Sequence, residues 1–122
     1  MNSYLALAAL ICAITVAFHC VAGGRRVIKP MLAVAGLNKT MKAVLYGCWH
    51  AFTLLYIGVA AGFLWAAISP EVRLLAQAAN LLTAGLSALS IFVTLRFRER
   101  LVRLPHWLLF GLASLFGALG TQ

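Results

Sequence analysis

Acidic residues are nearly absent from this 122-residue chain, which has only Glu71 and Glu99. Both lie outside the long apolar runs, so transport coupled to a carboxylate inside a membrane helix is not expected. A serine–histidine–acid triad within an apolar helix is not expected for the same reason. The small multidrug exporters also have four helices in a similar length, but they depend on a carboxylate in the first helix. This chain has none there, which excludes that family.

Local metal motifs are also missing. The sequence contains no CxxC, HxxxH or HExxH pattern and no phosphate-binding loop. Its three cysteines, Cys12, Cys20 and Cys48, are an odd number and fall in or near apolar runs. A structural disulfide is therefore not expected. Any metal or cofactor site would need ligands from different helices, which spacing in the sequence cannot test.

Long uncharged runs dominate the chain, which is 64% hydrophobic with a mean hydropathy of +1.00. A membrane-spanning helix needs about 20 apolar residues. We predict an all-α, integral membrane four-helix bundle that forms a single transmembrane domain over residues 1–122. The expected helices cover about 3–22, 43–67, 73–95 and 105–120, and the fourth is short.

Positive charge is confined to short stretches between these runs, and the net charge is +8. A soluble nucleic-acid binder would spread such charge over a polar surface, so no nucleic-acid partner is expected. The first and third connections carry five and four basic residues, whereas the second carries only Arg73 beside Glu71. Basic loops stay cytoplasmic. The predicted location is a bacterial inner membrane, crossed several times, with both termini periplasmic.

The two basic connections suggest contact with lipid headgroups. Each basic residue near a membrane surface contributes about 1 kcal/mol of attraction to anionic lipids. The candidates are Arg25, Arg26, Lys29, Arg96, Arg98, Arg100 and Arg103. The simpler interpretation is that these charges only set the topology. Within the first connection, Pro30 favours a helix start and Gly36 or Asn38 a helix end, which predicts a short interfacial helix over about 30–37.

Small and polar residues form stripes along two of the expected helices. Helices in lipid associate through small residues that allow close approach and through a few polar contacts. The second helix carries the small stripe Gly47, Ala51, Gly58 and Gly62. The third carries the polar stripe Asn80, Thr83, Ser87, Ser90 and Thr94. Hydroxyls can bond the preceding turn, which favours a packing seam for the polar stripe. The alternative is that it lines a transport path.

Three histidines lie in the half of the helices nearest the basic connections. At 1.5 Å per residue, His19 is about 9 Å from Arg25 and His50 is about 12 Å from Lys42. His106 follows Arg103 by three residues. Ionisable residues inside a membrane are functional candidates by default. His19, His50 and His106, with Cys20 and Cys48, are candidate ligands for haem or a transition metal, or contacts for a quinone headgroup. The alternative is that the histidines make interhelical hydrogen bonds.

Three short motifs carry a resemblance. They are H…GG…P, CWH and LPxW, and they contain His19, Gly23, Gly24, Pro30, Cys48, Trp49, His50, Pro105 and Trp107. The chain resembles a family of small, uncharacterised bacterial four-helix membrane proteins over nearly its whole length. The resemblance implies a four-helix fold in the bacterial inner membrane and no particular activity.

Three functions remain open. The favoured hypothesis is a non-enzymatic structural or accessory bundle, alone, as a homo-oligomer or in a larger membrane complex. The first alternative is a haem-, metal- or quinone-binding bundle that uses the histidines. The second is a small transporter or channel lined by the polar stripe.

Overall fold

The computed structural model describes residues 1–103 and 105–122, and that part of the chain is helical with no strand. Leu104, the first residue of the LPxW motif, lies outside the described residues. The predicted all-α class is confirmed. In chain order the elements are α1 (Ser3–Phe18), η1 (His19–Ile28), α2 (Lys29–Ala33), α3 (Lys39–Ile68), η2 (Pro70–Val72), α4 (Arg73–Arg96), η3 (Leu101–Arg103) and α5 (His106–Gly120).

Three helical segments are long and apolar enough to cross a membrane. They are Ser3–Ala33, Lys39–Ile68 and Pro70–Arg96, with peak mean hydropathies of 2.4, 2.0 and 1.7. The fourth, His106–Gly120, is apolar but has only 15 residues. It corresponds to the run that the sequence indicated as short.

The first long helix differs from expectation. Residues 3–33 form one continuous helical segment, whereas the sequence predicted a helix over 3–22 and a separate one over 30–37. The joining element η1 is a π-helix, in which the N–H of Lys29 donates to the oxygen of Gly24. We attribute the continuity to this wider hydrogen-bonding pattern, which carries the helix to Pro30, a residue without an N–H to donate. Residues 34–38 then form the turn into α3.

Asn38 explains why α3 starts earlier than the expected residue 43. Its side-chain oxygen accepts from the N–H of Met41 at 2.9 Å, as an N-cap does. The cap places the helix start at Lys39, so one more turn of helix carries the basic residues Lys39 and Lys42.

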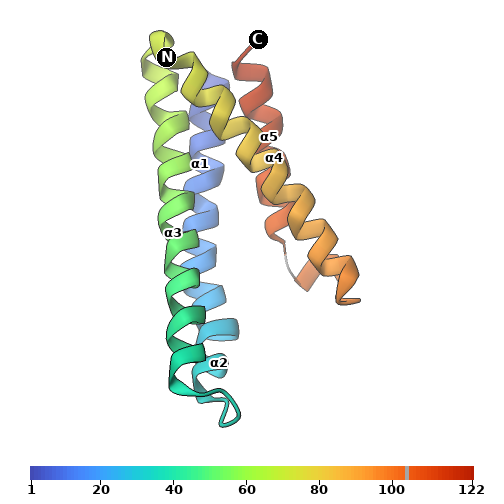
Figure 1. Ribbon diagram of the computed structural model, residues 1–122. Coiled ribbons are helices and arrows are strands. Elements are labelled where there is room, and N and C mark those ends of the chain that lie inside the picture. Colours follow the sequence, from blue (N-terminus) through green and yellow to red (C-terminus); the bar gives the residue numbers. More distant parts are fainter. Residues whose placement is uncertain (104) are drawn as a thin grey trace.

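Two helical hairpins make up the molecule. The Ser3–Ala33 segment pairs with α3, α4 pairs with α5, and α1 also packs against α5. The two termini lie at one end, and α3 and α4 diverge from that end toward the other (Figure 1). The main core therefore lies near the termini. It is built from small residues around one large ring and includes Leu5, Ala8, Phe63, Ala76 and Ala113.

Close contacts hold the terminal end together. The backbone N–H of Asn2 donates to Ala67 at 2.7 Å, and its side-chain amide donates to Gly120 at 2.8 Å. A Cβ at Gly117 would lie 2.7 Å from Oδ1 of Asn80 and 2.8 Å from the Phe63 ring. This end is closed because glycine and alanine let the helices approach.

Candidate ligand-binding cleft

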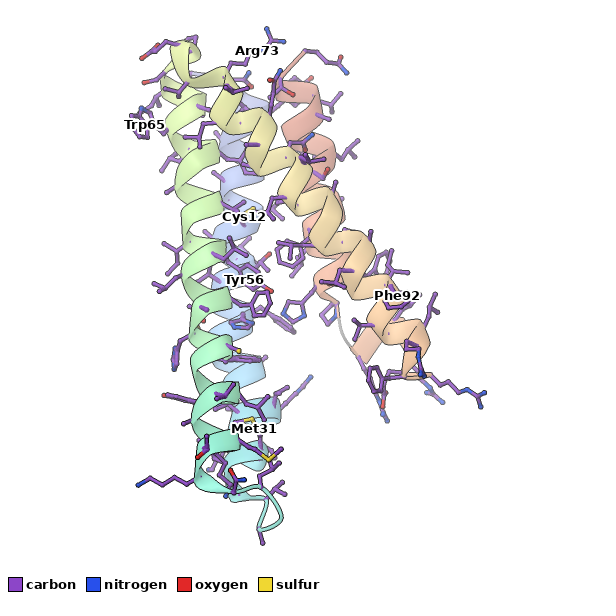
Figure 2. The ribbon with its side chains drawn as sticks, in the orientation of Figure 1. Cys12, Met31, Tyr56, Trp65, Arg73 and Phe92 are labelled. Atoms are coloured by element: carbon purple, nitrogen blue, oxygen red, sulfur yellow. The ribbon has the colours of Figure 1, made fainter. Side chains whose placement is uncertain are left out.

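A cleft of about 270 Å³ lies between the two hairpins where α3 and α4 diverge. Figure 2 shows Tyr56 projecting from α3 toward α4 and α5. The walls come from four elements, η1, α3, α4 and α5. The lining residues are His19, Trp49, Phe52, Tyr56, Leu86, Leu89, Ser90, Val93, Thr94 and His106. Most of this wall is aromatic or aliphatic, and two imidazoles provide its titratable nitrogen atoms.

His19 is the most buried of the three histidines, with 4% of its surface exposed. Its ring stacks on Trp49 with centroids 3.7 Å apart and planes 15° apart. Nε2 of His19 lies 3.4 Å from the backbone oxygen of Trp49. A carbonyl oxygen only accepts, so this contact favours the tautomer with the proton on Nε2 and leaves Nδ1 of the neutral ring as an acceptor.

His106 and Tyr56 complete the polar part of the cleft. The His19 ring centroid is 6.1 Å from that of His106 and 5.1 Å from that of Tyr56, both edge to face. Phe110 lies 5.0 Å from Tyr56 and closes the cluster toward the core. Edge-to-face packing is a preferred geometry for aromatic pairs, so these rings hold one another in position.

Helical spacing accounts for this aromatic cluster. Trp49, Tyr56 and Phe63 follow one another at intervals of seven residues in α3, which places them on one face. His106 and Phe110 are four residues apart in α5 and also share a face. In the sequence, His106 was a candidate site residue and Trp49 belonged to the CWH motif, but Tyr56 was not considered. The spacing of seven residues between these aromatic side chains of α3 was the signal that could have identified both Trp49 and Tyr56.

The structure brings two of the three candidate histidines together and places the third outside the cleft. His50 is exposed and does not line the cleft; its ring lies edge to face with Tyr46 at 4.4 Å. Successive residues of a helix point about 100° apart, so when Trp49 faces the neighbouring helices His50 faces away. The paired imidazoles are those of His19 and His106.

The candidate cysteine ligands do not join this cluster. Cys20 and Cys48 are exposed, and Cys12 is buried among the small residues of the core. Within residues 1–103 and 105–122, no group of three or more His, Cys, Asp or Glu side chains could hold a metal ion. The expected combination of histidines and cysteines is therefore not assembled there.

The small stripe on α3 faces outward along most of its length. Gly47, Ala51 and Gly58 are exposed, and a Cβ at Gly47 or Gly58 would meet no described atom within 4 Å. Gly62 is buried, and its Cβ would lie 3.5 Å from Leu75 of α4. Of these four small residues, Gly62 is thus the one that is buried against α4.

The polar stripe on α4 contacts α5 through Asn80 and Ser87. Its last two members, Ser90 and Thr94, line the cleft. Ser87 donates to the backbone oxygen of Trp107 at 2.7 Å, and Ser114 donates to Oδ1 of Asn80 at 3.1 Å. The other hydroxyls return to their own helix, from Thr83 to Asn80, from Ser90 to Leu86 and from Thr94 to Ser90. This pattern is typical of a packing seam whose hydroxyls are satisfied without water.

Basic residues gather at the end opposite the termini. The first group, Arg25, Arg26 and Lys29, is exposed along η1 and α2. The second, Arg96, Arg98, Arg100 and Arg103, is exposed at the end of α4 and in the following connection. Both groups lie on the side toward which the hairpins diverge (Figure 1). The cleft thus lies between a closed, small-residue end and an open, basic end.

No protein-family model matches the chain, and neither a search of curated proteins nor a search of solved structures found a match. Function is therefore inferred from the residues themselves. The cleft offers flat aromatic surfaces together with imidazole and phenol groups that can donate or accept hydrogen bonds. Such a wall suits a flat ligand ring that has hydrogen-bonding atoms at its edge.

Proposed function

We propose that the protein is an integral membrane protein with four spanning helices, both termini periplasmic and the basic end cytoplasmic. Three long apolar helices support this placement. So does the outer surface, where large apolar side chains are exposed along every long helix, for example Leu10, Leu54, Leu81 and Phe92. Soluble monomers rarely expose contiguous apolar surface of this kind. The charge asymmetry between the two ends supports the proposed orientation.

Reporter fusions test this placement. Alkaline phosphatase joined after Gln122 is expected to be active, and green fluorescent protein at the same position is expected to be dark. The same reporters inserted between Ala35 and Gly36, in the turn before α3, are expected to give the opposite result. A fluorescent fusion at the C-terminus would contradict the proposed orientation.

Within this membrane, we propose that the protein binds the flat headgroup of a membrane-soluble quinone in the cleft. The main observation in support is the cluster of His19, Tyr56 and His106 beside the Trp49 ring. A quinone ring presents flat faces for aromatic stacking and two carbonyl oxygens for hydrogen bonds. The N–H of His106 and the O–H of Tyr56 are suitable donors to such oxygens. His19, whose N–H faces the Trp49 carbonyl, holds the stacking ring in position.

The size of the cleft favours a single ring over a macrocycle. Pockets for drug-sized ligands measure about 300–1,000 Å³. A cleft of about 270 Å³ is just below this range, so it fits a headgroup whose tail remains outside. Leu89 and Val93 of α4 form part of its wall and are exposed, so the tail would leave toward the hydrocarbon.

Fluorescence quenching tests quinone binding. Purified protein in mild detergent is titrated with a decyl-benzoquinone, which quenches tryptophan on contact. Saturable quenching is expected, and it should persist in Trp65→Phe, because that side chain is exposed on the far side of α3 (Figure 2). Trp49→Phe should lose the saturable component. Quenching that rises linearly and equally in all three proteins would contradict the proposal.

Histidine variants assign the donors. Loss of one neutral hydrogen bond costs about 1 kcal/mol, so His106→Leu is expected to weaken binding about fivefold. His19→Leu removes the ring stacked on Trp49 and should weaken binding as well. His50→Leu is the matched control, because it removes an imidazole that does not line the cleft. Equal affinities in all three variants would show that the imidazoles do not contact the ligand.

A structural or accessory role is the second candidate, and the outward small stripe of α3 favours it. Gly58 is exposed on a helix face that suits close approach of another helix. Gly58→Leu would then change the oligomeric state in detergent while leaving quinone titration unaltered. A monomer in both proteins would remove the support for this candidate.

A further inference from the structure

A second pocket, of about 300 Å³, shares Trp49 and His106 with the cleft. Its other walls come from α1, η1 and η3. Arg26 of η1 and Arg103 of η3 both line it, although they are far apart in the sequence. Phe18 and Val27 supply an apolar wall beside them. The pocket therefore combines two guanidinium groups with apolar surface.

A glycine is required for this pocket to form. A Cβ at Gly23 would overlap the Trp49 ring, so only glycine lets η1 lie directly against that ring. The contact makes Trp49 a wall shared by the pocket and the cleft. Arg26 lies three residues after Gly23 in the same element, and both residues line the pocket.

The charge of the pocket is positive on balance. Arg103 forms an ion pair with Glu99 at 3.1 Å, and this is the only ion pair within residues 1–103 and 105–122. Both partners are largely exposed, so water screens the pair and weakens it. Arg26 makes no ion pair in that part of the chain. Two guanidinium groups against one carboxylate leave capacity for an external anion.

We propose that this pocket binds the phosphate of an anionic membrane phospholipid between Arg26 and Arg103. This inference rests on the proposed membrane placement, because the ligand comes from the bilayer. Guanidinium groups present several N–H donors and pair well with phosphate oxygens. The positive end of the molecule is also where headgroups of a cytoplasmic leaflet would lie.

The apolar wall distinguishes a lipid from a free phosphate ion. Val27 lines the pocket and is 46% exposed, and Val21 of the same element is 57% exposed. Val27 therefore extends the apolar surface from the pocket to the outside of η1. An acyl chain attached to the bound phosphate would lie along this surface, whereas inorganic phosphate would gain nothing from it.

Native mass spectrometry tests the proposal. The protein is released from mixed micelles that contain equal amounts of phosphatidylglycerol and phosphatidylcholine. The wild type is expected to keep one phosphatidylglycerol in preference to phosphatidylcholine. Arg26→Gln and Arg103→Gln are each expected to lower that preference about fivefold or more, the effect of about 1 kcal/mol per basic residue.

Neighbouring arginines provide matched controls. Arg25→Gln and Arg100→Gln remove the same charge from the same two connections but do not line the pocket. Both should keep the wild-type preference. An equal loss in all four variants would mean diffuse attraction, and no preference in the wild type would mean no site; either result overturns the proposal. Displacement of the lipid by millimolar inorganic phosphate would overturn it as well.

Two further measurements separate this proposal from the quinone proposal. Circular dichroism spectra of all four variants should match the wild type, because the altered side chains are exposed. Quinone titration of Arg26→Gln should give the wild-type affinity, because Arg26 does not line the cleft. Lost lipid preference with intact quinone binding therefore supports both sites, and retained lipid preference in Arg26→Gln overturns only the phosphate site.

Discussion

The two ends of the molecule are built from the same helices but differ in the size of the side chains between them. Near the termini, alanine and glycine bring four helices together around Phe63. Toward the basic end, Trp49, Tyr56 and His106 lie between the hairpins, which diverge there. Small residues give close helix contact, and large rings leave clefts at their edges. The difference explains why the candidate sites lie in the open half.

Glycine substitutions should separate the two ends most clearly. In Gly117→Ala the new methyl group would meet Asn80 and the fully buried Phe63 at under 3 Å. We expect the free energy of unfolding to fall by about 1–3 kcal/mol, the usual cost of overpacking. Gly58→Ala meets no described atom, so it should cost nothing and even gain up to about 1 kcal/mol from helix propensity. Unfolding in mixed micelles measures both.

Equal free energies of unfolding for the two glycine variants would contradict this difference between the ends. That result would mean that the helices at the terminal end can shift to accept a methyl group. Close packing would then not be the reason for glycine at position 117.

Asparagine caps offer a second contrast. Asn2 caps α1 and also bonds two other helices through Ala67 and Gly120. Asn38 caps α3 with a single bond to Met41. Loss of a cap costs about 0.5–2 kcal/mol, and Asn2→Ala also loses the side-chain bond to Gly120, worth about 1 kcal/mol. Asn2→Ala should therefore destabilise the protein about 1 kcal/mol more than Asn38→Ala in the same unfolding assay.

Two histidine variants compare a buried ring with an exposed ring within the open half. His19→Ala removes the ring stacked on Trp49, and such aromatic pairs contribute about 0.5–1.5 kcal/mol. His50→Ala removes an exposed ring that touches Tyr46 one turn away, an interaction worth about 0.2–0.5 kcal/mol. Thermal unfolding of both variants should rank His19 above His50. The reverse order would contradict the buried position of His19.

Serine variants should give the smallest effect. Ser87→Ala loses an interhelical bond to Trp107, and such bonds average about 0.6 kcal/mol in membranes. Ser90→Ala loses only a bond to Leu86 of its own helix, so a change near zero is expected. Indistinguishable stabilities at high precision would show that the seam between α4 and α5 does not depend on Ser87.

Hydropathy predicted the helical elements well, because burial of apolar side chains against lipid or protein needs only a long uncharged run. The first connection was predicted less well. Pro30 suggested the start of a separate helix. Instead, the helical segment continues from the π-helix through Pro30, and the chain turns at residues 34–38. Sequence patterns report where a proline lies, and they do not report the hydrogen bonds that accommodate it.

The candidate site was predicted only in part. His19 and His106 were among the candidate residues, and they do lie together. His50 was also a candidate, but it faces outward. The positions of Trp49 and Tyr56 beside His19 depend on how α3 rotates against η1, and no spacing along one helix contains that rotation.

The amino-acid sequence by itself determined that this chain forms a few long apolar helices with most of its positive charge between them. That outcome needs only local information, the hydropathy of each run and the position of each charge. Tertiary structure alone decided which imidazoles meet, which glycines contact another helix and which arginines share a pocket. Those outcomes depend on helix rotation and divergence, which are set by packing between residues far apart in the sequence.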